Sequence, residues 1–152
     1  MKALTLWQPW ASLVAMGEKK VETRCWSTTY RGDLAIHAAA QLPPGWLGRS
    51  RYGPIFRQEL ATVLRVREIS LDGRVESLPR GAVLCIVRLV SIRPTDQVAE
   101  TLDKRELIFS NYESGRYAWF FEMVKKFDDP IPVKGNRLLW NWNGKPYNRP
   151  GL

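Results

Sequence analysis

Residues 2–26 read KALTLWQPWASLVAMGEKKVETRCW and contain two alternating stretches on either side of a helical one. Apolar and polar side chains alternate over 2–7 and again over 20–26, and this period of two predicts two strands. Between them, Pro9 can occupy the first turn of a helix, where its missing N–H costs no hydrogen bond. Gly17 can end that helix because glycine tolerates a positive φ. The segment therefore predicts a strand, a short helix and a second strand.

The remainder of the chain predicts further strands separated by short helices. Strands are expected at 34–38, 82–92 and 116–124, helices at 55–68 and 96–104, turn-rich segments at 41–54 and 71–81, and a short final element within 135–142. The strongly apolar stretch 82–92 is expected at the centre of the sheet. Thr95 is a candidate helix cap, and Pro130 and Pro132 are expected to break the chain after the last long strand. These elements predict one mixed α+β domain over residues 1–152, built as a closed β-barrel.

The composition is that of a folded, basic protein. Of its 152 residues, 45% are hydrophobic and 25% are charged, and 23 Lys and Arg against 15 Asp and Glu give a formal net charge of +8. A surplus of this size favours an anionic partner, most often nucleic acid, although many basic proteins bind none. The chain also has seven tryptophans, whose flat rings either fill the core or stack on nucleobases.

The sequence argues against several kinds of site and location. Cys25 and Cys85 stand apart, and the single histidine, His37, cannot complete a zinc site with them, so we expect no metal and no cofactor. Free thiols suit a reducing compartment, and a cytoplasmic location is expected. No apolar run is long enough to cross a membrane, and Gln8 and Pro9 interrupt the N-terminal stretch that a signal peptide would need.

The densest polar cluster is GEKKVETR, residues 17–24. On a strand, Glu22, Arg24 and Trp26 share one face, and Lys19 can swing to that face from the preceding turn. An ammonium, a carboxylate and a guanidinium would then meet at the mouth of a strand, where they can bind a phosphate or a base edge. Lys19 and Glu22 are also the candidate catalytic pair, because such groups transfer protons in buried sites. The alternative is a row of solvated ion pairs on an exposed strand.

Two groups of aromatic and polar residues are further candidates for binding. Trp7, Gln8 and Pro9 lie at a strand-to-helix junction, where Gln8 can read a base edge and Trp7 can stack or fill the core. Trp26 is the better stacking candidate, because it shares a strand face with the charged residues of the polar cluster.

Later in the chain, Tyr117 and Trp119 share a strand parity, and they either line the cleft or fill the core. His37 ends a strand, and we expect a structural hydrogen bond to backbone rather than acid–base chemistry. The cations near turns are candidate phosphate ligands: Arg31, Arg116, Lys134 and Arg137.

A set of short motifs occurs in order along the chain. LWQPWASLVAMGEKKVETR (6–24) contains a G-x-K-x-x-E-x-R pattern, formed by Gly17, Lys19, Glu22 and Arg24. It is followed by WSTTYRGDLAIHA (26–38), LPRGAV (78–83), SGRYAW (114–119) and PIPVKGNRLLW (130–140). Together these motifs resemble the ASCH domain of the PUA-like superfamily. The resemblance covers nearly the whole chain, apart from roughly 41–76, which has the character of a variable insertion.

This resemblance implies a small PUA-like β-barrel with short helices packed at its openings, and a link to RNA. One bacterial branch of the family hydrolyses acylated cytidine nucleosides through a Lys, a Thr and a Glu, and another branch is a ribonuclease. That Lys matches Lys19, but the Thr position holds Glu22, so a covalent mechanism lacks its hydroxyl and Glu22 would have to activate a water instead. The candidates for the partner Glu are Glu100, Glu106 and Glu113.

Three functions are open from the sequence. The first is binding of RNA or a modified nucleotide through a basic, aromatic-lined cleft. The second is a small hydrolase that acts on an acylated pyrimidine nucleoside or on RNA with Lys19 and Glu22. The third is a protein-interaction module whose basic surface meets an acidic partner. The first two require that Lys19, Glu22 and Arg24 converge on one hollow flanked by tryptophan.

Overall fold

The fold is organised around one curved, six-stranded sheet. The computed structural model describes residues 1–46 and 52–145. Across the sheet the strands are β2 (Val21–Arg24), β5 (Tyr117–Pro132), β4 (Ala82–Pro94), β3 (Gly32–Ala38), β1 (Lys2–Leu6) and β6 (Leu139–Asn141). β1 and β3 are parallel, and the other neighbouring pairs are antiparallel. β4 therefore lies inside the sheet, as expected for 82–92.

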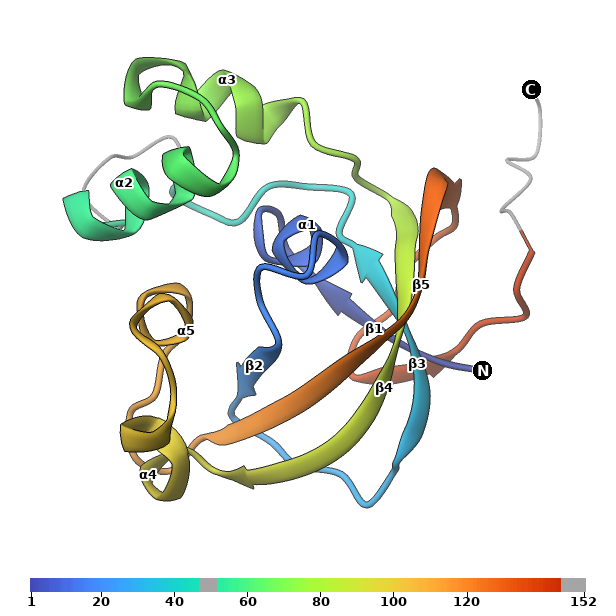
Figure 1. Cartoon of the computed structure of the whole chain (residues 1–152). Coiled ribbons are helices and arrows are strands. Elements are labelled where there is room, and N and C mark those ends of the chain that lie inside the picture. Colours follow the sequence, from blue (N-terminus) through green and yellow to red (C-terminus); the bar gives the residue numbers. More distant parts are fainter. Residues whose placement is uncertain (47–51, 146–152) are drawn as a thin grey trace.

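The long strands β4 and β5 bend around helix α1 (Trp10–Ala15), as Figure 1 shows. Register shifts interrupt the β4–β5 ladder at three places, and such bulges bend and twist a strand. The edge strands β2 and β6 do not pair with each other, so the sheet is a half-barrel rather than the closed barrel expected. The mixed α+β, barrel-like fold class with short helices is confirmed.

Helix α1 fills the hollow of this sheet. Its residues Ala11, Val14 and Ala15 are buried in the main hydrophobic cluster together with side chains of β1, β3, β4 and β5. Gly17 has φ 77°, the left-handed conformation expected at the end of the helix. The order strand–helix–strand predicted for 2–26 is confirmed. Because the sheet curls, α1 can link β1 near one edge of the sheet to β2 at the other.

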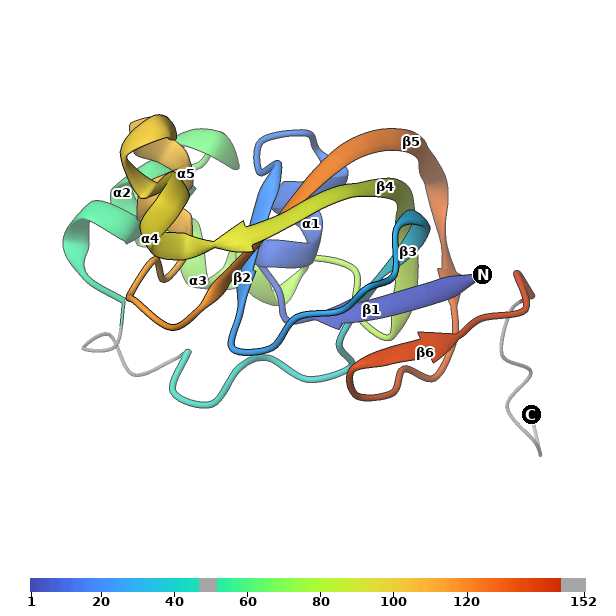
Figure 2. The same ribbon diagram turned by 90° about the horizontal axis from the view of Figure 1, so that it is seen from below.

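The remaining helices gather at the end of the molecule opposite the N-terminus (Figure 2). They are α2 (Pro54–Val63), α3 (Leu71–Glu76), α4 (Thr95–Val98) and α5 (Lys104–Phe109), with 3-10 turns at Glu68–Ser70 and Ala99–Thr101. α2, α3, Trp46 and Phe109 form a second hydrophobic cluster, which also takes Leu13 from α1. Within the described residues, no helix is long and apolar enough to span a bilayer.

The helix expected at 55–68 is shorter, and the turn-rich segment expected at 71–81 starts with a helix. α2 ends at Val63, and Arg65 takes a positive φ of 57° just beyond it. Leu71 and Val75 lie on one face of α3, Leu78 continues the same spacing just beyond its end, and all three are buried in the second cluster. This spacing of apolar residues would have predicted a helix at the start of the segment.

Two further expectations about chain breaks and caps are wrong. β5 continues through Pro130 to Pro132 instead of breaking there. β2 pairs only with residues 117–120, so the later part of β5 is an edge of the sheet, where prolines are tolerated. A proline at an edge costs no ladder hydrogen bond on the open side. Thr95 does not cap a helix with its side chain: its Oγ1 donates to the carbonyls of Glu113 (2.7 Å) and Arg116 (3.2 Å). Asp103 is the cap, and it accepts from the backbone N–H of Glu106 to start α5.

Candidate functional site

A cleft of about 820 Å³ lies between the end of β1, β2 and the helical end of the molecule. Its aromatic lining is Trp7, Trp10, Trp26, Tyr52, Phe56 and Phe109. Its polar lining is Thr5, Glu22, Thr23, Arg24, Ser110, Asn111, Arg116, Asn136 and Arg137. The half-barrel contributes one side of the cleft, and the second hydrophobic cluster contributes the other through Tyr52 and Phe56.

The aromatic side chains are held in place from behind. Trp26 meets the buried Trp119 ring edge-on at 4.8 Å, and its backbone carbonyl accepts a hydrogen bond from Nε1 of Trp119. Trp10 donates from its Nε1 to the carbonyl of Phe109 at 2.7 Å. Trp7 makes no hydrogen bond or ring contact of this kind within the described residues, and it is 46% exposed. The cleft thus offers one open and two anchored indole rings.

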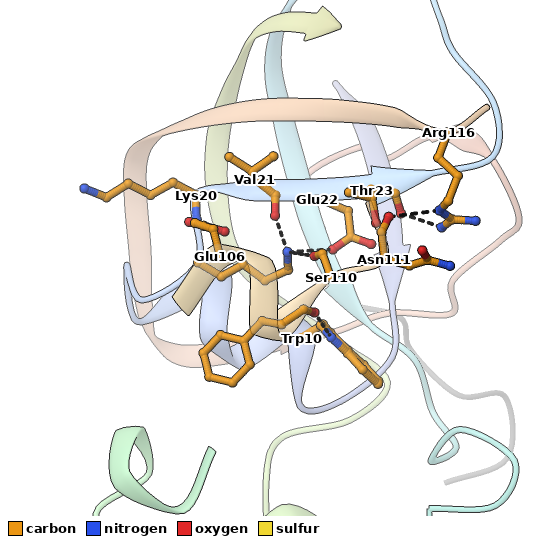
Figure 3. A network of polar contacts seen from close by, with 11 residues as sticks. Trp10, Lys20, Val21, Glu22, Thr23, Glu106, Ser110, Asn111 and Arg116 are labelled. Atoms are coloured by element: carbon orange, nitrogen blue, oxygen red, sulfur yellow. Dashed lines mark hydrogen bonds and ion pairs between the residues drawn. The ribbon is translucent and has the colours of Figure 1, made fainter. Parts of the chain in front are cut away.

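Three arginines contribute the positive charge of the cleft lining. The guanidinium of Arg24 lies 5.7 Å from the ring centroid of Trp26, a cation–π distance. Arg116 is anchored to backbone: it donates to the carbonyls of Thr23 and Asn111, each at 3.2 Å (Figure 3). Arg137 is exposed in the segment between β5 and β6. An anion at this rim would meet guanidinium groups from three separate parts of the chain.

Lys19 lies behind the cleft and not in it. It is 1% exposed and is absent from the cleft lining. Its ammonium donates to the carbonyl of Val21 and to Oγ of Ser110, and it pairs with Oε2 of Glu22 at 3.5 Å. Glu22 and Ser110 do line the cleft. Lys19 therefore contacts Glu22 and Ser110, two residues of the cleft lining, from behind.

A second carboxylate lies behind β2. Glu106 is buried and accepts from the backbone N–H of Lys20 at 2.6 Å. Burial raises the pKa of Glu106, and the Lys19 ammonium partly offsets this rise. Burial, followed by the charges of Glu106 and Glu22, also raises the pKa of Tyr112. Of the three glutamates considered as partners of Lys19, the structure brings Glu106 to this cluster.

The structure brings together four of the residues singled out from the sequence: Trp7, Glu22, Arg24 and Trp26. Alternation along β2 selects Glu22 and Arg24, whereas Trp26 lies just beyond the strand. Thr23 and Cys25, which were expected on the opposite face, line the cleft as well. Arg116 and Arg137, considered as phosphate ligands, also line the cleft.

The other predicted binding residues lie elsewhere. Gln8 is fully buried: its amide nitrogen donates to Pro79 O and Ser12 Oγ, and its oxygen accepts from Ser12 N, so it cannot read a base. The buried Pro9, which precedes α1, and the exposed Arg31 and Lys134 are all outside the cleft lining.

Tyr117 and Trp119 belong to the core, one of the two alternatives left open for them. Trp119 is fully buried, and Tyr117 packs against the same cluster. Sequence reasoning missed several lining residues: Trp10, Tyr52, Phe56, Ser110 and Asn111. Trp10 and Phe56 fall within expected helices and the others within loops or at a helix end, where no local pattern pointed to a cleft.

His37 has the structural role expected of it. Its Nε2 lies 2.9 Å from the carbonyl of Val133 and so must carry the proton, which leaves Nδ1 to accept from Thr5 Oγ1 at 3.2 Å. Thr5 in turn accepts from Nε1 of Trp140. This chain of hydrogen bonds ties β1 and β3 to the segment that supplies Asn136 and Arg137 to the cleft. Among the described residues, no group of His, Cys, Asp and Glu could hold a metal ion.

We expect the free energy of unfolding to fall as the pH drops below about 6.5, the ordinary pKa of histidine. Burial lowers the pKa of His37, so the unfolded chain takes up this proton first and folding is penalised in that range. Urea unfolding between pH 8 and pH 5 measures the effect. A His37→Gln variant should be less stable at pH 8 but show a flatter dependence, and equal slopes for the two proteins would contradict the assignment.

Comparison with known proteins gives a consistent result. The family model of the ASCH domain matches residues 4–131. Activating signal cointegrator 1 of Homo sapiens is 31% identical over 147 residues, and that of Mus musculus is 30% identical over 146; each alignment covers 93% of this chain and 22% of the relative. The chain thus spans about a fifth of the length of these relatives. A crystal structure of a ZmASCH point variant from Zymomonas mobilis has a TM-score of 0.45 and 14% identity, covering 87% of this chain and 73% of that one. With the family model matched from β1 to the end of β5, the chain belongs to the ASCH family.

Proposed function

We propose that the cleft binds one nucleotide unit, either within single-stranded RNA or as a free modified nucleotide. The observation that carries the proposal is the convergence in one cleft of Glu22 and Arg24 from β2, Trp26 just after it, and Trp7. A basic protein with a net charge of +8 suits an anionic ligand. Membership of a family linked to RNA points to the same class of ligand.

The size and lining of the cleft support a nucleotide. Small-molecule sites measure roughly 300–1,000 Å³, and this cleft has about 820 Å³. An indole ring that stacks on a base contributes roughly 1–3 kcal/mol without regard to sequence. The ring of Trp10 is fixed by the hydrogen bond from its Nε1, and the ring of Trp26 by its edge-on contact with the buried Trp119, so little side-chain freedom is lost on binding. An unpaired base fits such a cleft, whereas a base inside a duplex is not accessible to it.

Two other functions receive less support. Hydrolysis by Lys19 and Glu22 is less favoured because the Lys19 ammonium is shielded from the cleft and its donors are engaged. A protein-interaction role draws on the word "cointegrator" in the name of the human relative, which is 31% identical. Product formed from an acylated cytidine or from RNA by the wild type, and lost in Glu22→Gln, would favour the hydrolase.

We expect affinity for a short single-stranded RNA to fall by about 20-fold between 50 and 200 mM salt. Three phosphate contacts, one for each lining arginine, give a slope of about −2 in a log–log plot, at about 0.7 per contact for single strands. Arg24→Ala should weaken binding and make the slope shallower by about 0.7. Fluorescence anisotropy at several salt concentrations measures both.

Arg93→Ala is the matched control. Arg93 is an exposed arginine of β4 outside the cleft lining, so its removal changes the net charge by the same amount. The proposal predicts a slope close to wild type for this variant. Affinity that does not change with salt, or an Arg93 variant that matches the Arg24 variant, would argue against a binding cleft.

A further inference from the structure

Two polar side chains of the cleft lining, Glu22 and Ser110, lie side by side, and we call them the floor of the cleft. Glu22 and Ser110 both contact Nζ of Lys19, through Oε2 at 3.5 Å and through Oγ respectively. Both line the cleft, whereas Lys19 is buried behind them. Figure 3 shows the two side chains next to each other between β2 and the end of α5. A residue of the G-x-K-x-x-E-x-R pattern and a distant serine are thus held by one cation.

The hydrogen bonds decide what each group can offer a ligand. The Lys19 ammonium donates hydrogen bonds to Val21 O and Ser110 Oγ, and it forms an ion pair, without a hydrogen bond, with Oε2 of Glu22 at 3.5 Å. Because Ser110 Oγ accepts from Lys19, its own O–H is left to donate, and it donates no hydrogen bond within the described part of the chain. Glu22 is acceptor-only, and its Oε2 is buried without a hydrogen-bond donor in the described part of the chain. The floor is therefore one acceptor beside one donor.

The charges decide which end of a nucleotide faces this floor. Lys19 and Glu22 neutralise each other, and of the two only the carboxylate reaches the cleft. A phosphate placed on the floor would be repelled by that carboxylate. The arginines of the cleft lining, Arg24, Arg116 and Arg137, are the better site for it. The base then points inward and the phosphate outward.

We propose that Glu22 and Ser110 together read a base edge that carries an N–H beside a hydrogen-bond acceptor. Glu22 accepts from the N–H, Ser110 donates to the neighbouring acceptor, and Lys19 is the positioning residue that fixes both. This inference rests on the proposed function and adds the orientation of the ligand and the chemistry required of its base. A base whose N–H has been replaced by N-methyl leaves the carboxylate without a donor and is disfavoured.

The test compares short oligouridine with the same oligomer made from N3-methyluridine, and oligocytidine with its N4,N4-dimethyl counterpart. The methyl groups remove the N–H but keep the phosphates and the stacking surface. We expect the wild type to prefer each unmodified oligomer by about tenfold in Kd, the usual discrimination of a bidentate contact. In Glu22→Gln the amide oxygen is expected to turn to the Lys19 ammonium, which leaves an NH2 donor facing the base in place of the acceptor. This variant and Ser110→Ala should each abolish most of the preference, and Ser110→Thr, which keeps a hydroxyl, should retain it.

Matched controls are Glu122→Gln on β5 and Ser114→Ala, both exposed and outside the cleft lining, and both should keep the tenfold preference. Equal binding of modified and unmodified oligomers by the wild type overturns the inference, as does a preference that survives in Glu22→Gln. If the oligomers bind with the expected dependence on Arg24 but without this preference, the proposed function stands and only the role of Glu22 and Ser110 in base recognition is rejected. If no oligomer binds, both are lost. Should Ser110→Ala unfold, Glu22→Gln and Ser110→Thr still decide the question.

Discussion

Replacing Lys19 by methionine is expected to lower the free energy of unfolding by about 3–5 kcal/mol, the usual effect of breaking a buried ion pair from one side. The side chain of Lys19 is fully buried, and its ammonium is the ionic partner of Glu22. Without it, the Glu22 carboxylate has no counter-charge, and the carbonyl of Val21 and the Ser110 hydroxyl lose a donor. Urea unfolding monitored by tryptophan fluorescence measures the change.

Two variants show whether this loss comes from the ion pair. Lys20→Met changes the neighbouring lysine, whose exposed side chain is remote from these contacts, and should stay within about 0.5 kcal/mol of wild type. The double variant Lys19→Met/Glu22→Leu removes both charges and should recover much of the stability, because an apolar pair can replace a buried ion pair. Its RNA affinity should stay low, since the acceptor is gone. A Lys19→Met protein as stable as wild type would contradict the role given to Lys19.

Gly135→Ala is expected to cost about 1–3 kcal/mol of folding stability and to weaken RNA binding in the same protein. A Cβ at this position would lie 2.4 Å from Cε1 of His37 and 2.9 Å from Oγ1 of Thr5. The imidazole is poorly placed to move aside, because both of its nitrogens are hydrogen-bonded. The segment from Val133 onward must therefore shift, and it supplies Asn136 and Arg137 to the cleft. Thermal unfolding and anisotropy titration measure the two effects.

Gly73→Ala is the matched control for that substitution. Gly73 lies inside α3, and a Cβ there meets nothing within 4 Å. Alanine should be neutral or stabilise this helix by up to about 1 kcal/mol, without effect on the cleft. If Gly135→Ala were as stable as Gly73→Ala, the segment between β5 and β6 would not be held against His37 in the way described.

The parts of the site that could be predicted from sequence are those within one strand. The alternation over 20–26 predicted Glu22 and Arg24 in one site, because side-chain direction along a strand follows from local geometry. Trp26 also lines the cleft, but it lies beyond the end of β2. The same reasoning could not tell which aromatic residues are buried in the core and which line the cleft. Trp26 and Trp119 are in contact, yet only Trp26 lines the cleft, since depth in a fold depends on other segments.

Gln8 illustrates a second limit. A polar residue at the junction between a strand and a helix suggested a binding role, but its amide closes hydrogen bonds to Ser12 and Pro79 within the core. Ser110 illustrates the converse. It follows α5, far along the chain from Lys19, and its hydroxyl reaches the ammonium only because α5 lies beside the start of β2, where Glu106 accepts from Lys20 N. Contacts between distant segments carry no local signature.

The separation of the main and the second hydrophobic cluster affects how ligand preference can diverge among related chains. Glu22 of the floor and the rim residue Arg24 belong to β2, whereas Tyr52 and Phe56 come from a helical segment with its own core. Substitutions in that segment can reshape one wall while the sheet that holds the floor keeps its packing. Related chains can therefore share one scaffold and one mode of anchoring, yet differ in the size and shape of the molecule they admit.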